Sequence, residues 1–316
     1  MHMKRIYNFA FFLAVTFFLT SCDKEDDSKA VQYTPTMEFL RSQPNLSIYT
    51  AALEKAQLRA YTEGPGPFTY FAPTDAAFIS AGITADSLSK MTSGAVNYLL
   101  QYHILNSLLI KQDLLGAQFS FARGTQLGNT ASTQVFIGNG AVDSAYVNGV
   151  NILKADNMVS SGVVHVINEL LAPPVFKGNM QSLLQSTGQH SIFIAALTKA
   201  NRWSSLTGTG PFTVLAPTDA AMNAAGFNMA AITAAPMARV DSIVRYHYFS
   251  GFRYFSNDFG DRVSAQTALG SNRTLKASKN GSQIAGKSNT MPVNVIRRNI
   301  LGTNGVLHVI DGVLLY

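Results

Sequence analysis

The sequence GPFTYFAPTDAAF at residues 66–78 returns as GPFTVLAPTDAAM at residues 210–222, with ten of the thirteen positions identical. After the Gly-Pro pair, the run of aromatic and aliphatic residues predicts a buried strand, which ends at the next proline. The Thr-Asp pair that follows predicts the start of a helix, with the threonine as its N-cap. Each copy therefore contains a strand, a tight turn and a helix.

The repeat extends well beyond this stretch. Residues 39–103 align without a gap on residues 183–247, and residues 162–167 align on residues 305–310. Apolar residues at helical spacing precede the strand in each copy, and short apolar runs separated by Gly, Asn and Thr follow the second helical region. Self-similarity over so long a period predicts two consecutive domains that share one mixed α and β fold.

Three signals, each present twice, resemble one known family. They are Phe-Thr-x-x-Ala-Pro-Thr-Asp-Ala-Ala, a Tyr-His pair that closes a helix, and Gly-Val-x-His-Val-Ile. In order and spacing they are similar to fasciclin-like domains, over residues 36–173 and 176–316. The resemblance implies an α+β fold in each copy, a β-sandwich or wedge with packed helices. The second copy departs from the pattern at Leu215, Met222 and Tyr248-Phe249, but these residues keep the apolar volume.

Residues 1–21 are typical of an export signal, because Lys4 and Arg5 precede a mainly apolar run from residue 6 to residue 19. The run is short for a transmembrane helix. It ends at Leu-Thr-Ser-Cys22, which resembles the lipobox of bacterial lipoproteins, in which acyl chains are attached to the cysteine. The resemblance implies lipidation of Cys22, although a signal peptide that merely contains a cysteine is the alternative. Residues 22–35 are predicted to form an acidic flexible tether.

These features together predict the cellular location of the protein. We expect a lipid-anchored protein of the outer membrane, at the cell surface or on the periplasmic face. The membrane, reached through the N-terminal lipid, is then one of its partners.

Four histidines recur in equivalent pairs, His103 with His247 and His165 with His308. We expect them to be buried and to bridge backbone groups, because no carboxylate recurs beside them to complete a metal site. No metal and no cofactor is expected. Nucleophile-elbow, phosphate-loop and zinc-protease motifs do not occur in the sequence, so we expect a protein that is not an enzyme. A catalytic site assembled from residues far apart in sequence is the alternative.

Two groups of residues are candidates for binding. In animal fasciclin proteins the Tyr-His region is linked to cell adhesion, and Tyr102-His103 and Tyr246-His247 match it here. A Tyr-His pair that ends an apolar helix is otherwise simply core with a polar rim. The second group is basic, and we select Arg273, Lys276 and Lys279 from it because they lie in a Gly-, Asn- and Ser-rich stretch.

Charge separates the two copies. Residues 36–173 hold 7 Lys or Arg and 9 Asp or Glu, whereas residues 174–316 hold 13 and 5. A basic field in an exported protein favours acidic glycans, anionic lipid head groups or an acidic protein as partners, and nucleic acid is not expected. We predict salt-sensitive binding of acidic polymers by the second copy and not by the first. A solvated basic face that only aids solubility is the alternative.

The sequence thus predicts a protein for adhesion or binding that recognises glycans, an extracellular polymer or a partner protein. The alternative is a structural accessory subunit of an outer-membrane complex. Three Asp-Ser-apolar triplets resemble an O-glycosylation pattern of some bacteria, although chance explains such short matches equally well. They are Asp86-Ser87-Leu88, Asp143-Ser144-Ala145 and Asp241-Ser242-Ile243.

Overall fold

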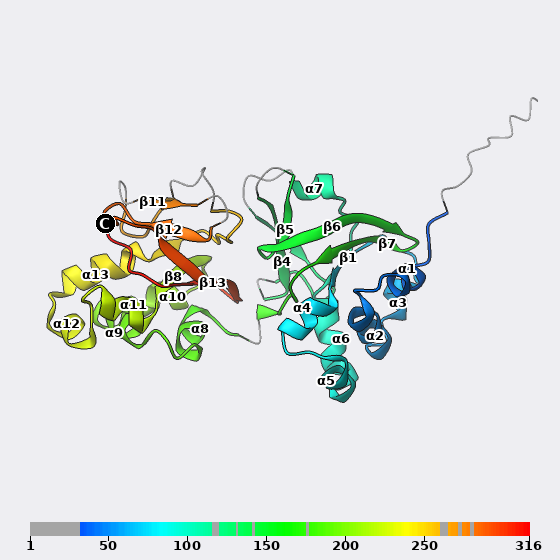
Figure 1. The fold of residues 1–316 in the computed structure, drawn as a ribbon, viewed down its shortest axis with the longest axis horizontal. Coiled ribbons are helices and arrows are strands. Elements are labelled where there is room, and N and C mark those ends of the chain that lie inside the picture. The colour runs from blue at the N-terminus through cyan, green and yellow to red at the C-terminus, as the bar shows by residue number, and fades with distance from the viewer. Residues whose placement is uncertain are drawn as a thin grey trace, which may run out of the picture. The chain divides into compact units, whose positions relative to one another are not determined.

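The computed structural model describes residues 32–115, 120–130, 132–140, 143–174, 177–259, 265–270, 274–278 and 281–316. The predicted export signal, Cys22 and most of the predicted tether lie outside these residues. Two domains of the same plan follow the two repeats (Figure 1).

The elements of the first domain are α1 (Thr36–Ser42), α2 (Ser47–Lys55), α3 (Arg59–Thr62), β1 (Phe68–Pro73), α4 (Asp75–Ser80), α5 (Ala85–Lys90), α6 (Ser93–Gln101), β2 (Ile104–Leu105), α7 (Lys111–Leu115), β3 (Phe121–Gly124), β4 (Gln134–Asn139), β5 (Ala145–Val147), β6 (Val150–Val159) and β7 (Gly162–Ile167). Those of the second domain are α8 (Met180–Ser186), α9 (Ser191–Lys199), α10 (Trp203–Thr207), β8 (Phe212–Pro217), α11 (Asp219–Ala224), α12 (Met229–Ala234), α13 (Met237–Tyr246), β9 (Tyr248–Ser250), β10 (Ala265–Gln266), β11 (Thr274–Ala277), β12 (Gln283–Ala285), β13 (Val293–Gly302) and β14 (Gly305–Ile310).

Each domain has one seven-stranded sheet, and the strand order is the same in both. The order is β2-β1-β7-β6-β5-β4-β3 in the first domain and, written in the same direction, β9-β8-β14-β13-β12-β11-β10 in the second. β1 pairs with β7 and β8 with β14 in parallel, while the other neighbours pair antiparallel. Phe71 lies opposite His165 and Leu215 opposite His308. The two strand motifs that define the repeat are therefore hydrogen-bonded neighbours.

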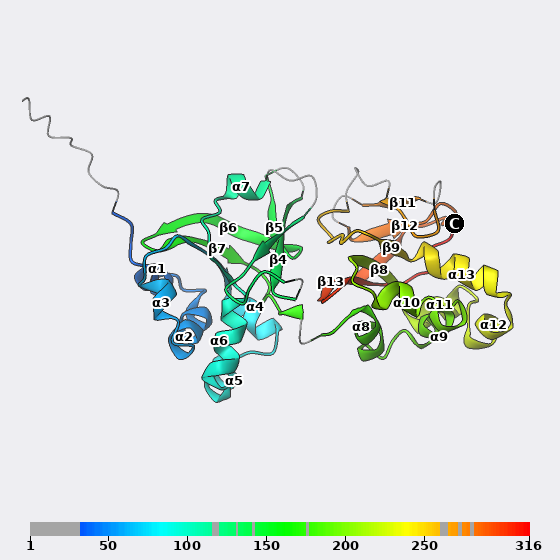
Figure 2. The ribbon, with the colours of Figure 1, turned by 180° about the vertical axis from the view of Figure 1, so that it is seen from behind.

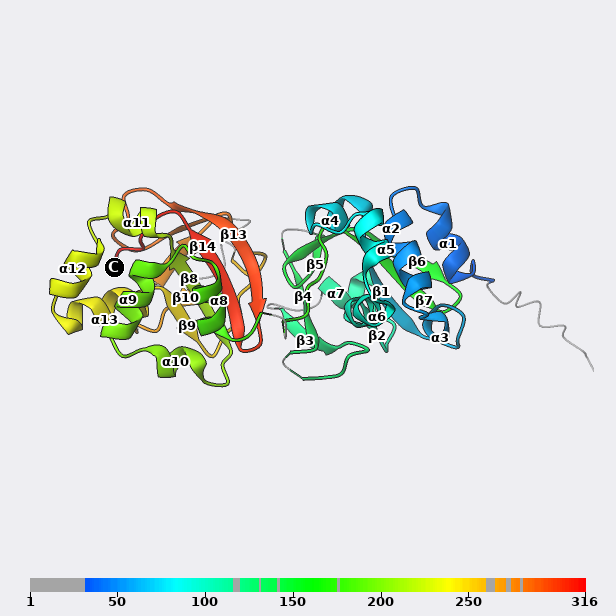
Figure 3. The same cartoon turned by 90° about the horizontal axis from the view of Figure 1, so that it is seen from below.

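Helices cover one side of each sheet, α1 to α6 in the first domain and α8 to α13 in the second (Figures 1 and 2). Figure 3 shows these helical layers in front of the strands. Because successive side chains of a strand point to opposite faces, Tyr70 and Ala72 pack in the core beneath the helices. Phe71 lies in a second core, which it shares with Val135 of β4 and Val147 of β5.

The second core explains the shape of the sheet. β4 and β5 lie toward the opposite end of the sheet from β1, yet their side chains pack in the same apolar cluster as Phe71. The single sheet therefore curls so that its two ends share one core. Leu215 has the equivalent place in the second domain. The predicted α+β fold with packed helices is confirmed, in the form of a curled sheet in each domain.

The long strands β6 and β13 carry the same irregularity. Their pairing with the next strand shifts register on both sides of Lys154 and of Arg297. Asp156 and Asn299 both have a φ of 59°, in the left-handed region that residues other than glycine seldom adopt. Each strand therefore contains a bulge, which turns the side chains next to it away from the regular pleat.

Candidate functional site

The Tyr-His histidines bridge backbone groups at the ends of α6 and α13. Nδ1 of His103 donates to the carbonyl of Leu99 at 2.9 Å, and its Nε2 accepts from the amide of Leu171 at 3.0 Å. His247 makes the same two bonds, to Ile243 and Leu314. An amide must donate, so the proton of each neutral ring lies on Nδ1. Burial lowers the pKa of both rings to about 4.

The second pair of histidines uses the opposite tautomer. Nε2 of His165 donates to the carbonyl of Leu109 at 2.8 Å, and Nδ1 accepts from the amide of Asp156 at the β6 bulge. His308 repeats this arrangement with Tyr254 and Asn299. Burial, together with the smaller effect of the Arg298 charge, lowers the pKa of His308 to about 4. His165 thus links the bulge of β6 to the loop after β2, and His308 links the bulge of β13 to the loop after β9.

The predicted Tyr-His binding residues are all fully buried. The hydroxyl of Tyr102 donates to the carbonyl of Gln134 at 2.8 Å and accepts from Asn148. The hydroxyl of Tyr246 accepts from the amide of Lys287 at 2.8 Å. These contacts give the tyrosines and histidines a structural role. Recognition by them stays a prediction, and the folded domains present none of their side chains to solvent.

The two repeated aspartates join two helices. Thr74 caps its own helix α4, since it accepts from the amide of Ala77 as predicted. The carboxylate of Asp75, however, accepts from the hydroxyl of Ser47 and the amide of Ile48, both at 2.8 Å, at the start of α2. Asp219 does the same with Ser191 and Ile192 at the start of α9. A carboxylate at a helix N-terminus is favoured by the exposed amides there.

Of the three basic residues predicted to bind a ligand, the structure describes one. Lys276 is exposed on β11, and Arg273 and Lys279 lie outside the described part of the chain. Arg245 is engaged with the carbonyl of Ala268. Three further cations, Lys287, Arg297 and Arg298, are exposed, and none of them forms an ion pair within the residues that the structure describes. The second domain therefore does present uncompensated positive charge.

Two cations of the second domain line the same cavity. A cavity of about 250 Å³ is lined by Lys177, Leu183, Ser186, Thr187, Arg297 and Ile300. Burial lowers the pKa of Lys177, and the neighbouring charge of Arg297 lowers it further. The sequence gives no signal for this pairing, because Lys177 precedes α8 and Arg297 lies far along the chain on β13.

The family model for the fasciclin domain matches residues 44–173 and again residues 188–316. The chain belongs to the fasciclin family. Both matches contain the parallel strand pair and the bridging histidines described above. Fasciclin domains are associated with adhesion and binding.

Relatives of this fasciclin chain occur in animals and in bacteria. It is 28% identical over 272 residues to transforming growth factor-beta-induced protein ig-h3 of Sus scrofa, which covers 85% of this chain and 37% of the pig protein. Periostin of Homo sapiens is 31% identical over 195 residues, 60% of this chain and 22% of periostin. Protein sll1483 of Synechocystis sp. is 29% identical over 141 residues, 44% of this chain and 73% of that protein. The chain spans well under half the length of the two mammalian relatives.

Among solved structures, the chain is similar to a domain pair from the insect cell adhesion molecule fasciclin I. The sequence identity is 20% and the TM-score is 0.41, and the match covers 84% of this chain and 92% of the insect pair.

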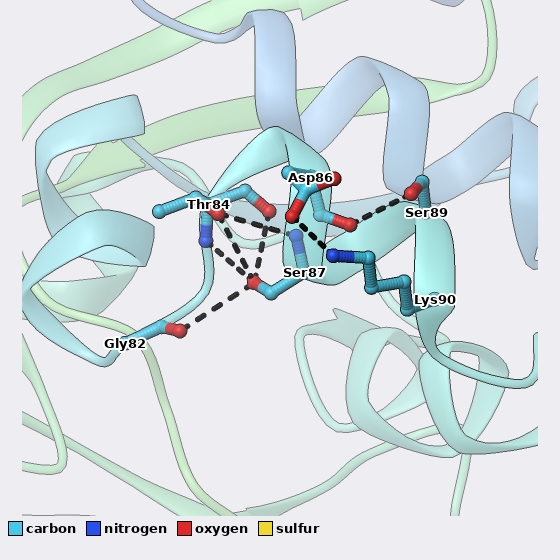
Figure 4. A network of polar contacts seen from close by, with 6 residues as sticks. All are labelled: Gly82, Thr84, Asp86, Ser87, Ser89 and Lys90. Carbon is cyan, nitrogen blue, oxygen red and sulfur yellow. Dashed lines mark hydrogen bonds and ion pairs between the residues drawn. The ribbon is translucent and has the colours of Figure 1, made fainter.

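The Asp-Ser triplets of the fasciclin domains have local structural contacts. Thr84 and Ser87 form a capping box at the start of α5: the amide of Ser87 donates to Thr84 Oγ1, and the amide of Thr84 donates to Ser87 Oγ (Figure 4). Asp86 pairs with Lys90 one turn later, at 2.6 Å. In α13 the hydroxyl of Ser242 donates to the carbonyl of Ala238. The hydroxyls of Ser87 and Ser242 therefore take part in holding their helices.

The described residues contain neither a group of side chains placed for a metal ion nor a helix that could span a membrane. No group of three or more His, Cys, Asp or Glu side chains there is placed to hold a metal ion. No helix in that part of the chain is long and apolar enough to cross a bilayer.

Proposed function

We propose that this fasciclin protein is a lipid-anchored adhesion protein that binds an acidic glycan or another acidic polymer through its second domain. The observation that carries the proposal is the unequal charge of two domains with one fold. The second holds 13 cationic and 5 acidic residues, and the first holds 7 and 9.

The exposed cations of the second domain support this proposal. Lys276, Lys287, Arg297 and Arg298 are exposed and lack an ion pair within the described chain, so their charge is available to a ligand. Charge of one sign attracts a polyanion and raises its local concentration. In the first domain Lys90 and Lys111 are paired with Asp86 and Asp143. Its exposed cations without an ion pair within the described residues are Arg59, Arg123 and Lys154.

Binding of this kind depends on ionic strength. The screening length is about 8 Å at physiological salt and about 3 Å at 1 M. The full chain should be retained at low salt on immobilised polygalacturonate and not on neutral dextran, and salt should elute it. Equal retention on both supports, or elution that salt does not change, contradicts the proposal.

The proposed anchor is Cys22, which lies outside the described residues. Several acyl chains on one residue hold a protein on a bilayer far more firmly than a single chain does. The wild-type chain expressed in a bacterium should therefore sediment with the membranes, and Cys22→Ala should appear in the soluble fraction. A Cys22→Ala variant that still sediments with the membranes contradicts the anchor and leaves the polymer-binding proposal untouched.

A further inference from the structure

The cavity lined by Lys177 and Arg297 has an unusual balance of charge. Its walls contain these two cations, two hydroxyl residues and two aliphatic residues, and no carboxylate. Lys177 is half-buried. A half-buried charge in a protein is normally paired, because leaving water costs free energy. The pKa of Lys177 is lowered by burial and, in addition, by the charge of another cation, Arg297. None of the six residues that line this cavity supplies a negative charge.

The fold holds these two cations in place. Lys177 precedes Gly178, whose carbonyl accepts from the amide of Thr303 at 2.9 Å in the turn between β13 and β14. The amide of Met180 donates to Asn304 Oδ1 at 2.9 Å in the same turn. Arg297 lies at the bulge of β13. Both cations are therefore carried by backbone that is fixed to the same turn and strand.

The other walls indicate what the cavity selects. The hydroxyl of Ser186 donates to the carbonyl of Leu183 and that of Thr187 to the carbonyl of Leu184, both at 2.9 Å. Their protons are thus already used inside α8. Leu183 and Ile300 add apolar surface. The donors left for a ligand are the ammonium and guanidinium groups, which form their strongest hydrogen bonds with negatively charged oxygen atoms.

The first domain lacks the equivalent pair. The repeat places Lys154 where the second domain has Arg297, both opposite the same position of the next strand. Extending the repeat toward the N-terminus places Tyr33 where the second domain has Lys177. At these two equivalent positions the first domain therefore has one cation, and the second domain has two.

We propose that Lys177 and Arg297 together bind one oxyacid group, a carboxylate or a sulfate, of an acidic polysaccharide. This proposal rests on the proposed function. It identifies the two side chains that contact one acidic group of the polymer. A cavity of about 250 Å³ accommodates one charged group of a polymer and leaves the rest of the chain on the surface.

The test compares two charge-matched variants of the full chain. Lys177→Gln with Arg297→Gln removes the pair in the cavity. Arg239→Gln with Lys199→Gln removes two cations of the same domain that neither line the cavity nor belong to the four exposed cations named above. Binding to polygalacturonate and to dextran sulfate is measured by calorimetry at one salt concentration, with neutral dextran as the control polymer and melting curves to verify folding.

The cavity variant should lose at least about tenfold in affinity, and the matched variant no more than about threefold. A loss confined to polygalacturonate or to dextran sulfate also supports the proposal and identifies the group as carboxylate or sulfate. Equal losses in the two variants, while the wild-type chain binds, overturn the cavity proposal and leave the general charge effect. Absence of wild-type binding to both polymers overturns the proposed function itself.

Discussion

His165 illustrates how single residues hold this fold. Its two ring nitrogens satisfy a carbonyl in the loop before α7 and an amide in the β6 bulge, at a fully buried position. A buried polar group that loses its partner costs about 1 to 3 kcal/mol. Because His308 repeats the arrangement, the contact belongs to the architecture of both domains.

The first prediction concerns this residue. His165→Ala leaves the carbonyl of Leu109 and the amide of Asp156 without their partner, so the free energy of unfolding should fall by about 1 to 3 kcal/mol. Lys154→Ala, at an exposed position on β6, should change it by less than about 0.5 kcal/mol. Urea unfolding measures both. An unchanged unfolding curve for His165→Ala, together with lost ligand binding, would instead make the residue functional.

The second prediction is a loss of stability in mild acid. Burial lowers the pKa of His103 and His247 from 6.5 to about 4, so the unfolded chain binds more protons between these values. Stability is therefore complete above pH 6.5 and falls as the pH decreases toward 4. At pH 5 the loss should be roughly 2 kcal/mol for each histidine.

Urea unfolding at pH 7, 6 and 5 measures this loss, and His103→Gln provides the comparison. That variant is less stable at pH 7, but its stability should fall less steeply with pH than that of the wild type. Parallel pH dependence of the two proteins would show that His103 is not the group that takes up the proton.

At the scale of elements, Asp75 and Asp219 connect helices that are neighbours in space and not in sequence. Each carboxylate accepts a backbone amide and a serine hydroxyl from the start of the preceding long helix. The third prediction is that Asp75→Ala and Asp219→Ala each lower the free energy of unfolding by about 1 to 2 kcal/mol. Glu63→Ala, at an exposed position just after α3, serves as the control. Thermal unfolding of the three variants measures these changes in stability. Loss of stability in only one of the two aspartate variants would contradict the shared role.

Much of this level could be predicted from the sequence. The strand, its proline end and the threonine cap are local, and residues 66–78 contain all the atoms involved. The partner of Asp75 and the parallel pairing of β1 with β7 depend on segments far apart in the chain. The place of Lys177 in the cavity could not be predicted for the same reason, because it depends on Arg297 of β13, which is distant in the sequence. Local patterns carry no information on such distant neighbours.

At the scale of the whole molecule, one fold occurs twice with opposite charge. Strand order, bulges and bridging histidines are the same in the two domains. The difference of 13 cations against 5 acids, and 7 against 9, therefore lies in residues that the fold does not require. Such surface residues can differ without a change of fold, and we propose that their charge gives the second domain its binding to acidic polymers.

One measurement tests this central claim most directly. Affinity for polygalacturonate is determined for the full chain with Arg273→Ser, Lys276→Ser and Lys279→Ser in the second domain. It is compared with the chain carrying Arg59→Ser, Arg123→Ser and Lys154→Ser in the first, where the same number of cations is lost. We predict a decrease on the order of tenfold for the first variant and a change within about twofold for the other. Equal decreases in the two variants would contradict the assignment of binding to the second domain.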